Sequence, residues 1–102
     1  MLDMRVKDKK SVQSPGEVID QYIIQGLGIG VRQLARALNV PPNRIYQIIQ
    51  NKREISVDTA IRLGYFLDMS PSFWLDIQTQ YQLHAAAITH PEIQSEVLPL
   101  RK

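Results

Sequence analysis

The sequence predicts an all-α protein, and three observations support this prediction. Helix-start and helix-stop signals recur at helical lengths, and apolar residues repeat three and four positions apart. Sustained strand-like alternation is confined to one short stretch at 93–97. The 102 residues, with 44% hydrophobic and 22% charged side chains, suit a single domain. We therefore expect one bundle of five helices.

The first predicted helix begins after Ser14. A serine cap, a proline at the first helical position and Glu17 three residues after the cap together mark a helix start. Apolar residues at 18, 19, 22 and 23 continue the helix, and the glycine-containing stretch 26–28 ends it. A second helix is predicted over 31–38 and closes at Asn39, because asparagine tolerates the left-handed backbone of a tight turn. A third begins at Pro42 and ends near Gln50.

Two further helices are predicted after residue 55. Ser56 caps the fourth, in which the residues at 60, 63, 64 and 67 share one face. Ser70 and Pro71 start the fifth, which is long and aromatic-rich and extends to about residue 88. These limits divide the chain into a flexible leader at 1–13, a folded domain at 14–88 and a C-terminal tail at 89–102.

Composition excludes several classes of function. The absence of cysteine excludes disulfides, thiolate metal sites and cysteine nucleophiles, and it favours a reducing cytoplasm. No stretch approaches the roughly 18 apolar residues of a membrane span, and the N-terminal residues lack the apolar core of a signal peptide. His84 and His90 have no partner at metal-ligand spacing, and the glycines at 26–30 lack the strand and lysine of a phosphate loop. We expect no catalytic residue, no metal and no cofactor, and therefore a protein that is not an enzyme.

The net charge of +2 hides an uneven distribution. Residues 1–20 hold four basic and four acidic residues, whereas residues 21–53 hold five basic residues and no acidic residue. Residues 54–102 hold six acidic and three basic residues, a balance of −3. This segregation fits a segment that binds a polyanion, joined to a half that serves another purpose. Chance fluctuation over about thirty residues explains the charges equally well when they are considered alone.

Residues 31–50 have the pattern of a helix-turn-helix. Two short helices flank a tight turn at 39–41, and Ala35 provides the small residue that a steep helix crossing requires. At about 100° per residue, the isoleucines of the second helix cluster on one side. Its amide side chains lie nearly opposite, with Arg44 and Tyr46 on the flanks. The exposed face of this helix therefore carries amides and a guanidinium.

Such a face suits the major groove of DNA, where asparagine and glutamine bond bidentately with adenine and arginine does so with guanine. We predict base contacts from Asn43, Arg44 and Gln47. Phosphate contacts are predicted at the ends of the motif, from Arg32, Gln33, Gln50, Lys52 and Arg53. The alternative for each residue is an ordinary solvated surface position.

The fifth helix carries an apolar stripe, part of which seals the core. The remainder is a candidate dimer interface, because tryptophan and tyrosine anchor such contacts and two-fold DNA readers need one. The candidate interface residues are Trp74, Ile77 and Tyr81. For Trp74 the favoured role is core packing, and for Tyr81 it is contact with the second subunit. The tail at 89–102 either adds an extended segment to the dimer or stays mobile.

Three blocks of sequence together resemble one family. They are Pro15-Gly16-Glu17-Val18, the segment 45–55 that follows the turn, and the segment 70–78 at the start of the fifth helix. Over residues 15 to 83 the chain resembles the HigA (VapI-type) antitoxins. The three blocks at this spacing are a far more specific signal than a helix-turn-helix alone. The resemblance implies a five-helix, lambda-repressor-like DNA-binding domain of the Cro/repressor type. It also implies a homodimer that represses its own operon at an inverted repeat and neutralises a RelE-like ribonuclease toxin, HigB.

The chain departs from the family pattern at three positions. Pro41-Pro42 replaces a hydroxyl cap, so neither a capping oxygen nor backbone N–H groups are available there. Asn51 replaces the usual glycine after the recognition helix and can adopt the same left-handed geometry. Tyr46 replaces what is often a small residue, and it is added to the base-contacting set because its ring can meet a thymine methyl group or cover the backbone.

Three hypotheses therefore remain open. The first is an antitoxin that also represses its own operon. The second is a stand-alone repressor of the phage or plasmid type, without a toxin partner. The third is a protein-interaction module that has lost DNA binding, which the Pro41-Pro42 departure keeps open.

Overall fold

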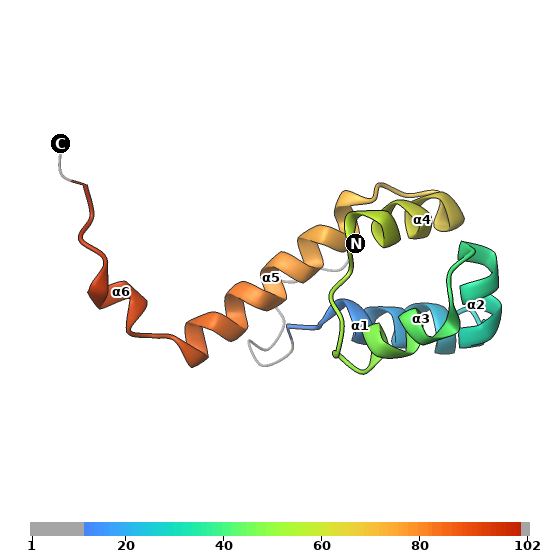
Figure 1. Ribbon diagram of the computed structural model, residues 1–102, viewed down its shortest axis with the longest axis horizontal. Coiled ribbons are helices and arrows are strands. Elements are labelled where there is room, and N and C mark those ends of the chain that lie inside the picture. Colours follow the sequence, from blue (N-terminus) through green and yellow to red (C-terminus); the bar gives the residue numbers. More distant parts are fainter. Residues whose placement is uncertain (1–11, 101–102) are drawn as a thin grey trace.

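The computed structural model describes residues 12–100, and regular structure in that range is entirely helical (Figure 1). The elements in chain order are α1 (Pro15–Val18), η2 (Ile19–Gln25), α2 (Val31–Leu38), α3 (Pro42–Ile49), α4 (Val57–Leu67), α5 (Ser72–Thr89) and α6 (Ile93–Glu96). The predicted all-α fold is confirmed. Most of the predicted leader at 1–13 lies outside the described residues.

The molecule consists of a helical body and a projection. Helices α1 to α4 and the first turns of α5 form the body, whereas the rest of α5 extends away from it and leads to α6 (Figure 1). The longest dimension is 52 Å, against 27 and 25 Å for the other two. Within residues 12–100, no helix combines the length and apolar character that crossing a membrane requires.

A single hydrophobic core holds the helices of the body together. Each contributes at least one deeply buried side chain, and those of η2, α2, α3, α4 and α5 include Ile19, Leu34, Ile45, Leu63 and Trp74. Ala35 is fully buried where α2 packs against α3, because a larger side chain would hold the two helices apart. Since every helix shares this core, the core sets the position of α3 relative to the rest of the body.

The predicted start of the first helix is confirmed as a reciprocal capping box. The Glu17 backbone N–H donates to Ser14 Oγ at 3.2 Å, and the Ser14 backbone N–H donates to Glu17 Oε1 at 2.8 Å. After its first turn the helix widens into the π-helical turns of η2. The apolar spacing did not predict this change, because it depends on how the backbone packs rather than on which residues are apolar.

Three residues other than glycine adopt left-handed backbone geometry, and each follows the end of a helix. They are Asn39, Asn51 and Asp68, with φ angles of 58°, 60° and 55°. The geometry predicted for Asn39 and Asn51 is therefore confirmed. Asparagine and aspartate are the side chains that tolerate this region best after glycine. These turns place α3 and the loop after it close to the core.

The structure differs from the five-helix prediction in two places. The first helix is divided between α1 and η2, and a short α6 forms where the sequence allowed strand-like alternation at 93–97. Local bonds explain α6, because the Val97 N–H donates to the Ile93 carbonyl at 3.1 Å and Ser95 Oγ donates to the Glu92 carbonyl at 2.9 Å. The fifth helix begins at Ser72, whose N–H donates to Ser70 Oγ at 3.2 Å.

Gly16 provides a test of how tightly α1 packs on α3. A Cβ atom at Gly16 would lie 2.0 Å from the carbonyl oxygen of Ile48, a backbone atom that cannot move aside alone. We expect Gly16→Ala to destabilise the fold by about 1–3 kcal/mol or more, measured by urea unfolding. Gly30→Ala is the matched control, since a Cβ there meets no atom within 4 Å, and we expect a change below about 1 kcal/mol. Equal stability of the two variants would contradict the close packing.

Candidate nucleic-acid interface

Helix α3 shows a polar face to solvent because its apolar face is buried. Ile45 and Ile48 are at most 1% exposed, and the opposite side of the helix carries Asn43, Tyr46 and Gln50, all exposed. Helical spacing predicted Tyr46 on the flank of this face, but at 42% exposed it forms part of the face itself. Gln47 is half-buried at the edge of the face. We call these four residues, Asn43, Tyr46, Gln47 and Gln50, the α3 face.

The start of α3 has the geometry that its two prolines dictate. Pro41 occupies the cap position with φ −63° and ψ 141°, and no side chain caps the helix. The Arg44 N–H donates to the Pro41 carbonyl at 3.0 Å. Because proline has no N–H, Asn43 supplies the first backbone donor of this helix. The helix therefore forms without a hydroxyl cap. Positions 41 and 42 have no backbone N–H group that could donate to a phosphate.

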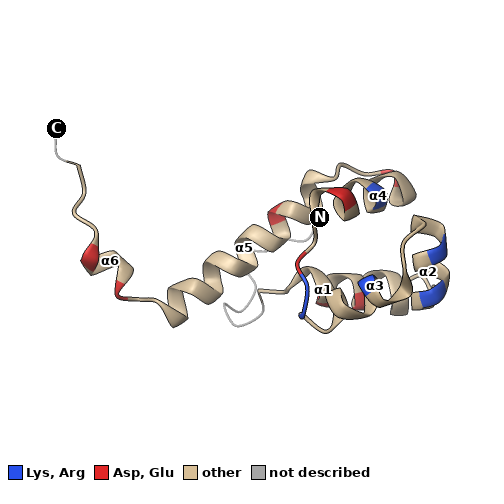
Figure 2. Cartoon of the chain, in the orientation of Figure 1, with Lys and Arg blue, Asp and Glu red and all other residues tan. Residues whose placement is uncertain are grey.

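Basic residues lie on α2, on α3 and in the loop after α3, and most acidic residues lie elsewhere in the chain (Figure 2). Arg32 and Gln33 are exposed at the start of α2, and Lys52 and Arg53 are exposed in the loop after α3. The acidic residues of the described range lie before the helix-turn-helix, at Glu17 of α1 and Asp20 of η2, or after it, from Glu54 onward. The structure thus brings the predicted phosphate-contacting residues to both ends of the helix-turn-helix.

The loop that carries Lys52 and Arg53 is held in place from both sides. Asn51 turns the chain with its left-handed backbone, and the Lys52 N–H donates to the Gln47 carbonyl at 2.8 Å. Farther along, the Gln78 side chain of α5 accepts from the Ile55 N–H at 2.6 Å and donates to the Ile55 carbonyl at 2.9 Å. Such two-point pairing fixes the loop against α5, a role of Gln78 that sequence patterns did not reveal.

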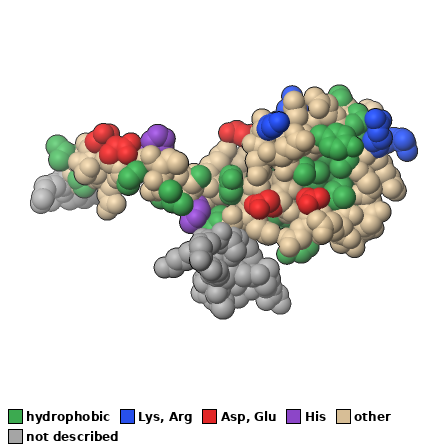
Figure 3. All heavy atoms as spheres, turned by 90° about the horizontal axis from the view of Figure 1, so that it is seen from below, with side chains coloured by type: hydrophobic (Ala, Val, Ile, Leu, Met, Phe, Trp, Pro, Cys, Tyr) green, Lys and Arg blue, Asp and Glu red, His purple; other side chains and the backbone are tan. Residues whose placement is uncertain are grey.

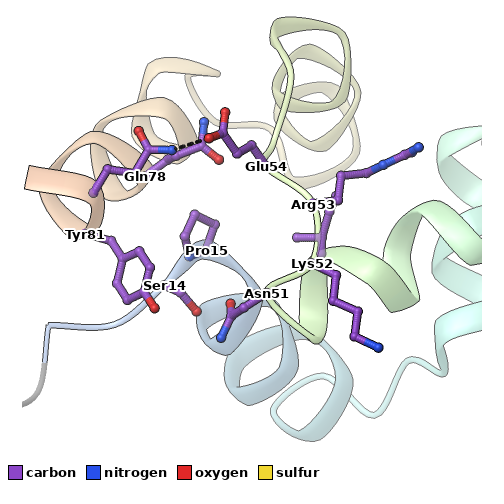
Figure 4. Close-up of a pocket in the computed structure, with 11 residues that line it drawn as sticks. Ser14, Pro15, Asn51, Lys52, Arg53, Glu54, Gln78 and Tyr81 are labelled. Atoms are coloured by element: carbon purple, nitrogen blue, oxygen red, sulfur yellow. Dashed lines mark hydrogen bonds between the residues drawn. The ribbon is translucent and has the colours of Figure 1, made fainter. Parts of the chain in front are cut away.

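Figure 4 shows the same loop together with α5. Ser14, Pro15 and Tyr81, together with residues of the loop that include Lys52 and Arg53, line a hollow of about 340 Å³, and the Lys52 and Arg53 side chains point away from Ser14, Pro15 and Tyr81. Gln82 donates to the Glu54 carboxylate at 2.8 Å and adds a second link between the loop and α5. Both basic side chains are therefore free to extend into solvent.

Arg44 is placed differently from the other predicted base-contacting residues. Its Nη1 lies 2.9 Å from Asp58 Oδ2 of α4, and the same carboxylate oxygen lies 2.9 Å from Arg62 Nε. Hydrogen bonds from Arg62 and then Arg44 hold the pKa of the Asp58 carboxyl below its ordinary value, so the group is ionised at neutral pH. Asp58 lies in the first turn of α4, where a negative charge is favourable. Its spacing of four residues from Arg62 indicates one of these pairs, but nothing in the sequence indicates the pair with Arg44.

Trp74 must be removed from the candidate dimer residues. It is 2% exposed and packs in the core, with its ring edge-on to Phe73 at a centroid distance of 5.2 Å. A side chain without accessible surface cannot contact a second subunit, so its role is the core packing that the sequence favoured. Ile77 and Tyr81 are half-buried and keep some accessible surface.

Beyond Tyr81 the projecting part of the chain exposes apolar side chains. Leu83, Ile88, Ile93 and Val97 are all more than half exposed. Figure 3 shows hydrophobic side chains along this projection, next to acidic and histidine side chains. Within residues 12–100, no group of three or more histidine, cysteine or acidic residues is arranged to hold a metal.

The fold and the α3 face define a helix-turn-helix protein of the DNA-binding class. The helix-turn-helix family profile matches residues 23–74. The virulence-associated protein I of Dichelobacter nodosus is 35% identical over 78% of this chain and 74% of its own length. Antitoxin HigA-1 of Vibrio cholerae serotype O1 is 31% identical over 92% of this chain and 89% of its own length. The chain therefore belongs to the HigA family of helix-turn-helix antitoxins.

Two solved structures extend this comparison. Antitoxin HigA of Pseudomonas aeruginosa, solved with the higBA promoter, is 37% identical with a TM-score of 0.79, over 87% of this chain and 98% of that chain. Antitoxin GraA, solved in complex with its operator, is 33% identical with a TM-score of 0.84, over 95% of this chain and 99% of that chain. These relatives are DNA-binding antitoxins rather than enzymes, in agreement with the non-enzymatic function that the sequence predicted.

Replacing Gln78 tests whether it holds the basic loop. We expect Gln78→Ala to lower the free energy of unfolding by roughly 1–3 kcal/mol, because it leaves the N–H and carbonyl of buried Ile55 without their partner. Urea unfolding followed by circular dichroism measures this change. The exposed Gln80→Ala on the same helix is the control. If the two variants unfold at the same urea concentration, the pairing does not stabilise the loop.

Proposed function

We propose that this protein binds the operator of its own operon as a homodimer, represses that operon, and neutralises a RelE-like ribonuclease toxin of the HigB type in the cytoplasm. The observation that carries the DNA-binding part is the α3 face. This face places amides and a tyrosine on one exposed side of the second helix of a helix-turn-helix whose two ends carry basic residues. A helix of this kind fits the major groove, where amide side chains read adenine.

Each predicted contact follows from its position around α3. Asn43, Tyr46 and Gln47 occupy the side of the helix that would enter the groove, and Arg44 lies at its edge. Gln50, Lys52 and Arg53 follow the helix, and Arg32 and Gln33 begin α2, positions from which side chains of this motif contact phosphates. That two similar antitoxins were solved with a promoter or an operator supports the same use of the fold here.

A dimer is proposed because an operator recognised by this motif contains two half-sites, and each subunit binds one of them. Two copies of α3 must lie about 34 Å apart to enter successive major grooves on one side of an inverted repeat. The projecting part of α5 supplies surface for such a dimer, since Ile88 is exposed there and continues the helical stripe of Ile77 and Tyr81. Pairing of this stripe with its copy would bury apolar area that a single chain leaves in water.

Toxin binding is proposed from family membership and from charge. Residues 54–102 carry a balance of −3, and they are the part of the chain that the α3 face does not use. An acidic surface of this kind favours association with a basic protein. A stand-alone repressor would share every DNA contact and differ only in having no such partner.

DNA binding is tested by salt titration and substitution at the α3 face. Binding to the chain's own promoter should weaken steeply with salt, with a logarithmic slope of about −0.9 per phosphate contacted. Gln47→Ala should cost roughly 1–3 kcal/mol and relax base preference, whereas Lys52→Ala should weaken all sequences alike and reduce the slope by about one. Fluorescence anisotropy with operator and scrambled duplexes measures both effects. A flat salt response would support instead a protein-interaction module that no longer binds DNA.

Toxin neutralisation is tested by co-expression with the product of the neighbouring reading frame, which we expect to be a small basic protein. We expect this chain to restore growth of a bacterial host arrested by that protein and to co-purify with it. Gln47→Ala should restore growth equally well, because the α3 face serves DNA rather than the toxin. If no neighbouring product co-purifies or arrests growth while operator binding persists, the protein is a stand-alone repressor.

A further inference from the structure

A cluster of three charged side chains joins the recognition helix to two other helices. Arg44 comes from α3, and Asp58 and Arg62 come from the first two turns of α4. We propose that Asp58 is a positioning residue for DNA recognition, which holds the Arg44 guanidinium at the edge of the α3 face so that Arg44 reads a base pair from a fixed pose. This inference rests on the proposed DNA binding and assigns a role to an acidic residue within the basic region.

The contacts of Arg44 restrain one side of its guanidinium. Nη1 donates to Asp58 Oδ2 at 2.9 Å and lies 3.4 Å from Oγ1 of Thr59, a side chain that is itself buried. Both contacts engage Nη1, so the edge formed by Nε and Nη2 is not used by them. That edge is the pair of parallel donors with which arginine meets O6 and N7 of guanine.

Asp58 is in turn held by the rest of the body. Arg62 Nε donates to the same carboxylate oxygen at 2.9 Å, and Arg62 Nη1 donates to the Leu38 carbonyl at the end of α2 at 3.0 Å. The cluster therefore connects Arg44 to α4 and to the end of α2, both of which are anchored in the core. The Arg44 side chain is thereby held by residues of α4 and by the end of α2, and not by α3 alone.

The energetics favour a role in recognition over a role in stability. Asp58 and Arg62 have side chains that are 55% and 38% exposed, and ion pairs in such positions contribute little to folding. Holding an arginine in its reading pose instead reduces the conformational entropy lost on binding. A carboxylate at this place also repels DNA phosphates, which lowers affinity for every sequence alike.

Asp58→Asn tests the proposal, because it removes the charge and keeps the shape. We expect affinity for unrelated DNA to rise roughly two- to fivefold as one repulsive charge is lost. Discrimination against substitution of the base pair read by Arg44 should fall about tenfold, the effect of one bidentate contact. Dissociation constants for the operator, for single-base-pair variants and for unrelated duplex are measured by fluorescence anisotropy at one salt concentration.

Two further variants of this chain distinguish positioning of Arg44 from a general effect of charge. Asp68→Asn removes the same charge from the end of the same helix, at a left-handed position that asparagine accepts, and it should leave base discrimination at the wild-type value. In an Arg44→Ala background, Asp58→Asn should cause no further loss of discrimination, because the residue that it positions is gone. Circular dichroism establishes that each variant is folded.

Two results would overturn the inference while leaving operator binding in place. One is full discrimination by Asp58→Asn at every base pair. The other is a loss of discrimination in Asp58→Asn that is equally large without Arg44. A wild-type protein that shows no preference for any sequence would instead overturn the proposed DNA function itself.

Discussion

Ile45 and Ile48 are buried in the core beneath α3, and their burial determines which side of that helix faces solvent. The two residues are three positions apart, so their side chains lie within about 60° of each other around the helix axis, and α3 packs on α1 and α2. Every other property of the α3 face follows from this packing. The residues on the opposite side are therefore exposed to solvent or to a partner. They are Asn43, Tyr46 and Gln50.

The ends of α3 show how a small domain positions polar groups without a catalytic pocket. At its start, two prolines preset the backbone and remove two amides. At its end, Asn51 reverses the chain, and Gln78 holds the next buried residue by both of its backbone groups. Lys52 and Arg53 lie between these two restraints. Their backbone is held in place, and their side chains are exposed to solvent. Rigid backbone and mobile side chains together suit a polyanion whose phosphates are regularly spaced.

Charge is divided along the chain. The helix-turn-helix is basic, and the acidic residues lie in the segments before and after it (Figure 2). Asp58 nevertheless lies beside Arg44 and is balanced there by two guanidinium groups. The projection formed by α5 and α6 leaves apolar side chains in water, which is costly for an isolated chain. That cost is the physical reason to expect a partner surface there.

The sequence by itself determined the local features of this protein. Capping residues, prolines and left-handed asparagines act through neighbouring atoms of the same chain, so the starts of the helices and the turns at Asn39 and Asn51 were predictable. Helical spacing likewise predicted a polar face on α3. Only the tertiary structure decided what depends on atoms distant in sequence. It placed Trp74 in the core, paired Arg44 with Asp58 across two helices, brought Gln78 to Ile55, and pressed Gly16 against the backbone of Ile48. Such contacts arise from the packing of whole helices, which no local pattern encodes.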